Sequence, residues 1–306
     1  MPLSLRQVSY FIAAAETGQI SQAAVDLNVS QSAVTAAIKG LESTLETRLF
    51  DRHATGVTLT YEGHQFLQHA RNITAAVNQA IRAPQGTRAA VTGQVRCGVT
   101  YTVAGYFLPP HLARFGRTFP GVSVELHEAS RGEIEDALLT GELDIAMILV
   151  SNLENRAGLD SEILIRSKRR LWLPTEHSLL KADTVSLADV AEEDYIMLTV
   201  DEARQTALRY WEQTPYRPKE IFRTSSVEAV RGMVATGMGV TLLSDMVYRP
   251  WSLEGQRIET RTLTDPVPSM DVGLTWKHGA TLTEAAQAFY EYLSLTFNGA
   301  GQGLIE

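Results

Sequence analysis

The chain has 306 residues, a formal net charge of −8 and a single cysteine, Cys97. This length exceeds one ordinary hydrophobic core and predicts two or three domains. One cysteine excludes an internal disulfide and a cysteine-rich zinc site, and the acidic balance argues against a protein that coats nucleic acid over its whole surface. No apolar run could span a bilayer and no signal segment follows Met1, so we expect a cytoplasmic protein without a membrane partner.

Residues 1–90 carry seven basic and six acidic side chains, so the rest of the chain holds the whole excess of negative charge. A local DNA surface near the N-terminus is compatible with this distribution, but charge alone does not establish one. The residue pattern is more informative. Apolar residues recur at helical spacing before Gly18, a residue that favours a left-handed helix end: Leu5, Val8, Phe11, Ile12 and Ala15.

Two further helices are expected before residue 46. Ser21 is predicted to cap the first, which would bury Ala23 and Ala24 and end near Asn28. Ser30 is predicted to cap the second, whose apolar stripe consists of Val34, Ile38, Leu41 and Leu45. Small residues let two helices cross closely, as a helix-turn-helix requires. The polar side chains Gln31, Ser32, Thr35 and Lys39 would then be free to contact bases or phosphates, although a merely solvated helix face has the same pattern.

Alternation at Val57 and Leu59 after a turn at Thr55 and Gly56 predicts a small β-hairpin wing. Residues 20–63 resemble the DNA-binding domain of LysR-type transcriptional regulators at these positions: Ala23, Ala24, Val29, Ser30, Gln31, Leu41, Glu42, Leu49, Phe50, Arg52, Leu59, Thr60, Tyr61, Glu62 and Gly63. The resemblance implies a winged helix-turn-helix over residues 1–60, with DNA contacts at Ser30, Gln31, Ser32, Thr35, Lys39 and Arg52.

The chain also departs from this family pattern. Ala36 and Ala37 stand where the family usually has a basic and a polar residue, and Glu46 stands where it usually has glycine. Fewer phosphate contacts are therefore expected than in a typical member.

A long linker helix is expected over residues 61–84, capped by Thr60 and ended by Pro84. Its apolar residues follow a heptad pattern that predicts a homodimer seam: Phe66, Ala70, Ile73, Val77 and Ala80. Alternatively, the same stripe packs against its own domain. The family resemblance further implies that two dimers pair into a homotetramer.

Residues 85–92 have the composition of a hinge, and a new domain is expected over residues 93–306. Strand-like and helical segments alternate from residue 95 onward, which predicts an α/β fold with a parallel sheet. The expected strands are residues 95–99, 122–126, 144–150, 171–173, 195–200, 221–223, 240–243, 258–263 and 272–276, and the expected helices include 108–115, 134–139 and 283–297.

This region resembles the effector-binding domain of the same family, which is similar to periplasmic binding proteins. The residues that carry the resemblance are Leu108, Pro109, Phe119, Pro120 and the runs 141–146 and 234–240. The resemblance implies two lobes around a ligand cleft, lobe I at residues 93–165 and 267–306 and lobe II at residues 166–266.

Ligands of such sheets bind where loops follow the strands. We therefore expect the effector to contact polar breaks after the strands: Thr100, Tyr101, Thr102, Ser130, Arg131, Thr199, Val200 and Ser226. The family resemblance supports Thr102 and Arg131 in particular. Because a guanidinium pairs with a carboxylate, Arg131 predicts a small organic acid, aromatic acids included, as effector. Alternatively, Arg131 lies on the cleft rim and pairs with Glu128 or Glu133.

Two other function classes compete with an effector-controlled regulator. An enzyme is disfavoured because Cys97 lies within a strand without a local base, and because the seven histidines lack metal-ligand spacing. No catalytic residue, metal or cofactor is therefore expected. A ligand-independent architectural DNA-binding protein or repressor is the second alternative, but it would not need so large and acidic a C-terminal part.

Overall fold

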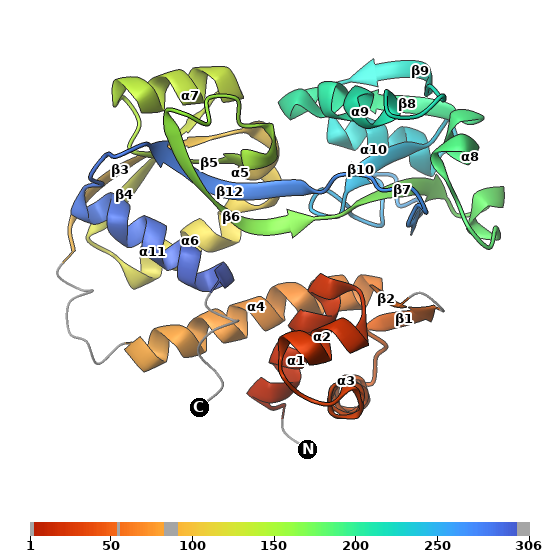
Figure 1. The fold of residues 1–306 in the computed structure, drawn as a ribbon, viewed down its shortest axis with the longest axis horizontal. Helices are drawn as coiled ribbons and strands as arrows, with labels where there is room; N and C mark the ends of the chain where they lie inside the picture. The colour runs from red at the N-terminus through yellow and green to blue at the C-terminus, as the bar shows by residue number, and fades with distance from the viewer. Residues whose placement is uncertain (1–2, 54–55, 83–90, 299–306) are drawn as a thin grey trace. The chain divides into compact units, whose positions relative to one another are not determined.

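The computed structural model describes residues 3–53, 56–82 and 91–298, shown in Figure 1. The chain divides into two units, Met1–Arg88 with Glu291–Glu306, and Ala89–Tyr290. Most of the expected hinge at residues 85–92 lies outside the described residues, as does Thr55 of the expected wing turn. Each unit is described separately below.

The first unit contains the expected three helices and wing. Its elements are α1 (Leu5–Thr17), α2 (Ile20–Asp26), α3 (Gln31–Leu45), β1 (Phe50–His53), β2 (Gly56–Leu59) and α4 (Tyr61–Arg82). Strands β1 and β2 pair antiparallel, so the winged helix-turn-helix is confirmed. The core lies between α1, α2 and α3, where Phe11 contacts Phe50 and Phe66 at ring-centroid distances of 5.1 and 5.0 Å.

Local capping determines where these helices begin and end. The Ser30 hydroxyl accepts a hydrogen bond from the Ala33 backbone N–H at 3.2 Å, and the Thr60 hydroxyl accepts one from Gly63 at 2.9 Å. Both caps were expected from the sequence. The prediction of a cap at Ser21 was wrong: the N-cap of α2 is Gln19, two residues earlier, and its side chain makes no capping hydrogen bond.

The end of α3 is strained at Glu46, whose φ of 50° lies in the left-handed region. That conformation costs a residue with a Cβ roughly 1–2 kcal/mol, whereas glycine adopts it freely. We expect Glu46→Gly to raise the free energy of unfolding by about 0.5–1 kcal/mol, because glycine's greater chain entropy offsets part of the gain. Urea denaturation measures the difference. Glu46→Ala is the control, because it removes the carboxylate but keeps the strain; equal stability of the two variants would contradict the prediction.

The second unit has two lobes. Lobe I is built on a five-stranded sheet of order β4-β3-β5-β12-β6, with α7 on one face and α6 and α11 on the other (Figure 1). Its elements are β3 (Gly93–Val99), α5 (Tyr101–Tyr106), α6 (Leu108–Thr118), β4 (Val122–Glu128), α7 (Arg131–Thr140), β5 (Ile145–Leu149), η3 (Val150–Asn152), β6 (Leu159–Ser167), β12 (Met270–Lys277) and α11 (Glu284–Asn298). Phe115 of α6 packs edge-on against Phe289 of α11 at 5.0 Å.

Lobe II contains a three-stranded sheet of order β10-β7-β11 and a two-stranded sheet of β8 and β9. Its elements are β7 (Arg169–Pro174), η4 (Ser178–Leu180), α8 (Leu187–Ala191), β8 (Asp194–Leu198), η5 (Val200–Glu202), α9 (Ala203–Trp211), β9 (Lys219–Thr224), α10 (Val227–Ala235), β10 (Thr241–Ser244) and β11 (Ile258–Arg261). Its core includes the fully buried Trp211 and Tyr195.

The expectation of a parallel sheet is correct only for part of the fold. Strand β3 pairs parallel with β4 and β5, and β8 with β9, but β12 pairs antiparallel with both β5 and β6. Strand β7 is also antiparallel to both of its neighbours. The reason is that the chain leaves lobe I through β6 and returns to it through β12, so these two strands lie side by side in opposite directions.

Candidate functional site

Helix α3 presents a polar surface next to its buried stripe. Val34, Ile38 and Leu41 are fully buried, whereas Gln31, Ser32 and Lys39 are exposed and Thr35 is partly buried. Successive helical residues turn by about 100°, which places these four polar residues on one arc of the helix. Ser30 joins that surface at its N-terminal end, where its hydroxyl lies 3.0 Å from that of Ser32.

The wing carries an exposed cation, Arg52 on β1. In the described part of the chain, neither Lys39 nor Arg52 forms an ion pair with a carboxylate. Both positive charges are therefore available to phosphate groups. The six residues expected to contact DNA are all exposed or partly exposed, as contact with DNA would require.

Three of the five residues of the expected dimer seam contact the core of their own domain. Ala70 is fully buried in that core, and Phe66 and Ile73, which stay partly exposed, pack against it. Internal packing therefore accounts for Ala70, because α1 packs along α4, whereas a seam at Phe66 and Ile73 stays a prediction. Val77 is partly buried but not part of that core, and the side chain of Ala80 lies outside the described residues.

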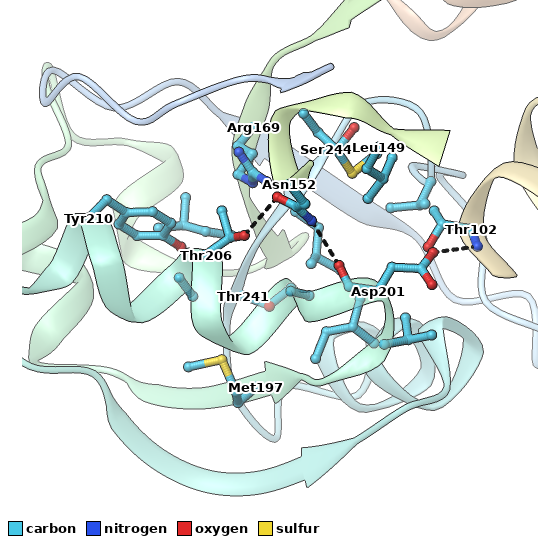
Figure 2. A pocket seen from close by; sticks show the side chains of 18 of the residues that line it. Thr102, Leu149, Asn152, Arg169, Met197, Asp201, Thr206, Tyr210, Thr241 and Ser244 are labelled. Carbon is cyan, nitrogen blue, oxygen red and sulfur yellow. Dashed lines mark hydrogen bonds between the residues drawn. The ribbon is translucent and has the colours of Figure 1, made fainter. Parts of the chain in front are cut away.

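A pocket lies between the two lobes of the second unit. Its volume is about 530 Å³, and this value includes open solvent at its mouth. Lobe I contributes Thr102, Leu149, Asn152 and Met270, and lobe II contributes the remaining walls. Figure 2 shows the Asn152 carboxamide between Thr206 and Asp201: it accepts from the Thr206 hydroxyl at 3.2 Å and donates to the Asp201 carbonyl at 3.1 Å. Polar groups from both lobes therefore meet in the pocket.

The loop at Asp201 joins the lobes across the mouth of this pocket. The Asp201 carboxylate accepts a hydrogen bond from the Thr102 backbone N–H at 2.7 Å. Asp201 and Glu202 both have positive φ, 50° and 58°, a conformation that costs roughly 1–2 kcal/mol per residue. A further hydrogen bond joins the lobes: the Tyr106 hydroxyl donates to the Glu228 carboxylate at 2.9 Å. These contacts join the two lobes beside the pocket and offset the backbone strain.

Arg131 does not line the pocket, and its guanidinium is already paired with carboxylates. It forms ion pairs with Glu135 and Glu154 at 2.8 Å and with Glu202 of lobe II at 3.5 Å. Burial lowers the pKa of Arg131, but the three carboxylates outweigh it and raise the pKa overall. The expectation that Arg131 would clamp an effector acid is therefore replaced by its alternative, pairing with glutamates, although the partners differ from the expected Glu128 and Glu133.

Of the eight residues expected at the effector site, two line the pocket, Thr102 and Val200. The others have structural roles or lie elsewhere. Ser130 and Ser226 cap α7 and α10. Thr100 is buried at the start of α5, and Tyr101 is exposed. The Thr199 backbone N–H donates to the Thr224 carbonyl. Two of these side chains, Ser130 and Ser226, thus stabilise helix ends.

Several lining residues were missed by the sequence reading: Asn152, Arg169, Thr206, Tyr210, Thr241 and Ser244. One signal could have found Arg169. It belongs to the run Lys168, Arg169, Arg170, close to the expected lobe crossing, where an arginine is placed beside the cleft. Thr206 and Tyr210 lie on α9, which was not predicted.

Groups that would suit an enzyme are inert here. Cys97 is buried, and that burial raises its pKa to about 12, so the thiol stays protonated. Among the described residues, no group of three or more histidine, cysteine or acidic side chains could hold a metal ion. None of the described helices has the length and apolar character required to cross a membrane.

Comparison with known proteins decides the family. Residues 88–297 match the family described as LysR substrate binding domain, and residues 5–64 match the bacterial regulatory helix-turn-helix protein, lysR family. The chain belongs to the LysR family of bacterial transcriptional regulators. It is therefore a DNA-binding regulator and not an enzyme, as LysR regulators bind DNA, respond to small-molecule effectors and form oligomers.

Full-length LysR regulators are among the relatives. The HTH-type transcriptional regulator AlsR of Bacillus subtilis is 30% identical over 256 residues, 82% of this chain and 84% of that protein. The crystal structure of HinK, a LysR family regulator from Pseudomonas aeruginosa, is 28% identical with a TM-score of 0.61, covering 95% of this chain and 98% of HinK. The C-terminal domain of a probable LysR regulator from Rhodococcus sp. RHA1 is 28% identical, covering 67% of this chain and 100% of that domain, with a TM-score of 0.61.

Proposed function

We propose that this LysR regulator is controlled by a small organic carboxylic acid, aromatic acids included, that binds between the lobes. The observation that carries the proposal is the pocket itself, which is lined by hydrogen-bonding groups from both lobes and by apolar side chains such as Leu149 and Met197. A ligand that bridges two lobes favours one arrangement of them over others. Bound acid thereby shifts the regulator between states that bind DNA differently.

The DNA contacts are proposed at Ser30, Gln31, Ser32, Thr35, Lys39 and Arg52. The exposure of the polar face of α3 and the unpaired charges of Lys39 and Arg52 support this assignment. The partner is double-stranded operator DNA, and the protein acts in the cytoplasm, where a bacterial chromosome lies.

The oligomer is proposed to be a homodimer that forms through the part of α4 beyond its own core, with pairs of dimers assembling into a homotetramer. Val77 supports this seam because it is apolar and lies outside the core that holds Phe66, Ala70 and Ile73. A dimer presents two recognition helices to two half-sites, which compensates for few contacts in each.

A DNase footprint of the full-length protein on its operator, with and without a panel of small acids and their neutral amides, tests this function. We expect at least one compound to change the footprint, whereas a ligand-independent DNA-binding architectural protein or repressor would give the same footprint throughout. Lys39→Ala is the control for the DNA surface. It should weaken DNA binding in every condition and lower the slope of log affinity against log salt by about one unit. An unchanged slope would remove Lys39 from the interface.

A further inference from the structure

Arg169 brings a guanidinium without a carboxylate partner to the pocket between the lobes. It is the first residue of β7, where the chain enters lobe II, and it lies at the pocket wall beside Asn152 and Tyr210 (Figure 2). One guanidinium nitrogen, Nη1, donates to the carbonyls of Pro268 and of Ser269, the latter at 2.8 Å. No carboxylate in the described chain lies within 4.0 Å of this guanidinium.

Neighbouring arginines behave differently. Arg170, the next residue, pairs with Asp245 at 3.0 Å, and the fully buried Arg231 pairs with Glu228 at 2.9 Å. Arg131, as described above, has three glutamates. Arg169 is also the sole cation among the described residues that line the pocket. The guanidinium of Arg169 is half-buried and its hydrogen-bond partners are carbonyls, so an anion that enters the pocket would interact favourably with its charge.

The electrostatic surroundings of Arg169 agree with this picture. Burial lowers the pKa of its guanidinium, and nearby Tyr210, Tyr195 and Asp271 only partly oppose that effect. Arginine nevertheless stays protonated in proteins, so the charge remains.

Tyr210 supplies a second donor in the same wall. Its hydroxyl is buried near the side chains of Tyr195 and Trp211, but it makes no contact with them that meets the distance and angle of a hydrogen bond. Burial raises the pKa of Tyr210 well above its usual value, so the phenol keeps its proton and can donate. A ligand oxygen in the pocket would give this hydroxyl a well-placed acceptor.

The opposite charge in the lining is Asp201, which is held by the Thr102 N–H. A ligand with two carboxylates would place its second charge in a pocket that already contains this anion. The remaining walls are neutral or apolar, with Leu149, Met197 and Met270 among them. These features favour an acid with a single carboxylate on an apolar body.

We propose that Arg169, with the Tyr210 hydroxyl beside it, holds the carboxylate of a monocarboxylic effector, and that Arg131 is not the acid-binding residue. This inference rests on the proposed function, since it assigns the acid-binding groups of that pocket. A guanidinium and a phenol hydroxyl that act together bind an acid more tightly than its neutral amide, because their hydrogen bonds to the carboxylate are charge-assisted.

Calorimetric titration of the full-length protein tests the assignment with three acids, acetate, phenylacetate and hexanoate, and with their amides at matched ionic strength. We expect phenylacetate or hexanoate to bind at least tenfold more tightly than the matched amide, and more tightly than the dicarboxylate 1,4-phenylenediacetate. Arg169→Met should abolish the preference for the acid, and Arg169→Lys should restore part of it. Tyr210→Phe should reduce it, while Arg131→Met should retain it.

Circular dichroism and thermal unfolding establish that each variant is folded at the titration temperature. If amides bind as tightly as acids, or if Arg131→Met rather than Arg169→Met abolishes the preference, the assignment of Arg169 is overturned while effector control stands. If no acid or amide binds and none changes the DNA footprint, both the assignment and the proposed function are overturned.

Discussion

Replacing Glu135 by alanine is expected to lower the free energy of unfolding of the second unit by about 3–5 kcal/mol, the range for breaking a buried ion pair on one side. Glu135 is only 4% exposed. Its carboxylate accepts from Arg131 at 2.8 Å and from the backbone N–H groups of Glu154 and Asn155 at 3.1 and 2.9 Å. Alanine would leave these donors without their acceptor and would release the loop that follows η3.

Urea denaturation of the full-length protein, followed by tryptophan fluorescence, measures this loss because all four tryptophans lie in the second unit. Glu135→Gln should fall between the wild type and Glu135→Ala, since the amide oxygen can still accept but the charge is gone. Asp136→Ala is the matched control: this neighbouring acid on α7 is exposed and should change stability by no more than about 0.5 kcal/mol. Equal effects of Glu135→Ala and Asp136→Ala would show that the buried carboxylate does not organise the loop.

This network also distinguishes Arg131, which the sequence predicts at the cleft, from Arg169, which the structure places in the pocket. Arg131 belongs to the framework that ties α7 to the loop after η3 and to Glu202 of lobe II. Among the described residues, Arg169 donates to carbonyls and pairs with no acid. The pair of Arg131 with Glu135 has the i,i+4 spacing of a helix and could be predicted locally, whereas Glu202 lies 71 residues away in the chain, and a local sequence pattern carries no information about that contact.

Features that depend on neighbouring residues were predictable. Ser30 and Thr60 cap α3 and α4 as expected because an N-cap hydrogen bond joins residues three apart. Gly18 and Asn28 adopt the expected left-handed helix ends, with φ of 71° and 53°. The wing and the recognition helix followed from the same short-range rules, supported by the family resemblance.

Features that depend on the whole fold could not be predicted from the sequence. The direction of β12 follows from the second crossing between lobes, and nothing in its own sequence distinguishes a parallel from an antiparallel strand. The apolar stripe of α4 satisfies a heptad pattern, yet Phe66, Ala70 and Ile73 pack in their own domain. Periodicity shows that a face is apolar, whereas its partner is decided by which surfaces remain uncovered once α1 has packed.

Val77 is apolar but lies outside the core of its own domain, so a substitution there tests whether α4 forms the dimer seam. We expect Val77→Asp to dissociate the dimer, because a carboxylate at a packed seam position must be desolvated without a partner. Affinity for an operator with two half-sites should then fall by a factor of about 10²–10⁴, the gain that linkage of two binding modules provides. Sedimentation equilibrium measures the dimer, and a gel-shift titration measures the affinity.

The adjacent Ala76→Asp is the matched control, since Ala76 is exposed on α4 and the same charge there leaves a seam through Val77 intact. It should remain dimeric with affinity close to wild type. Circular dichroism should show that both variants are folded, because neither side chain belongs to the core that contains Ala70. A Val77→Asp protein that stays dimeric and binds DNA normally would place the seam elsewhere, whereas loss of dimer only in this variant would assign it to the part of α4 beyond its own core.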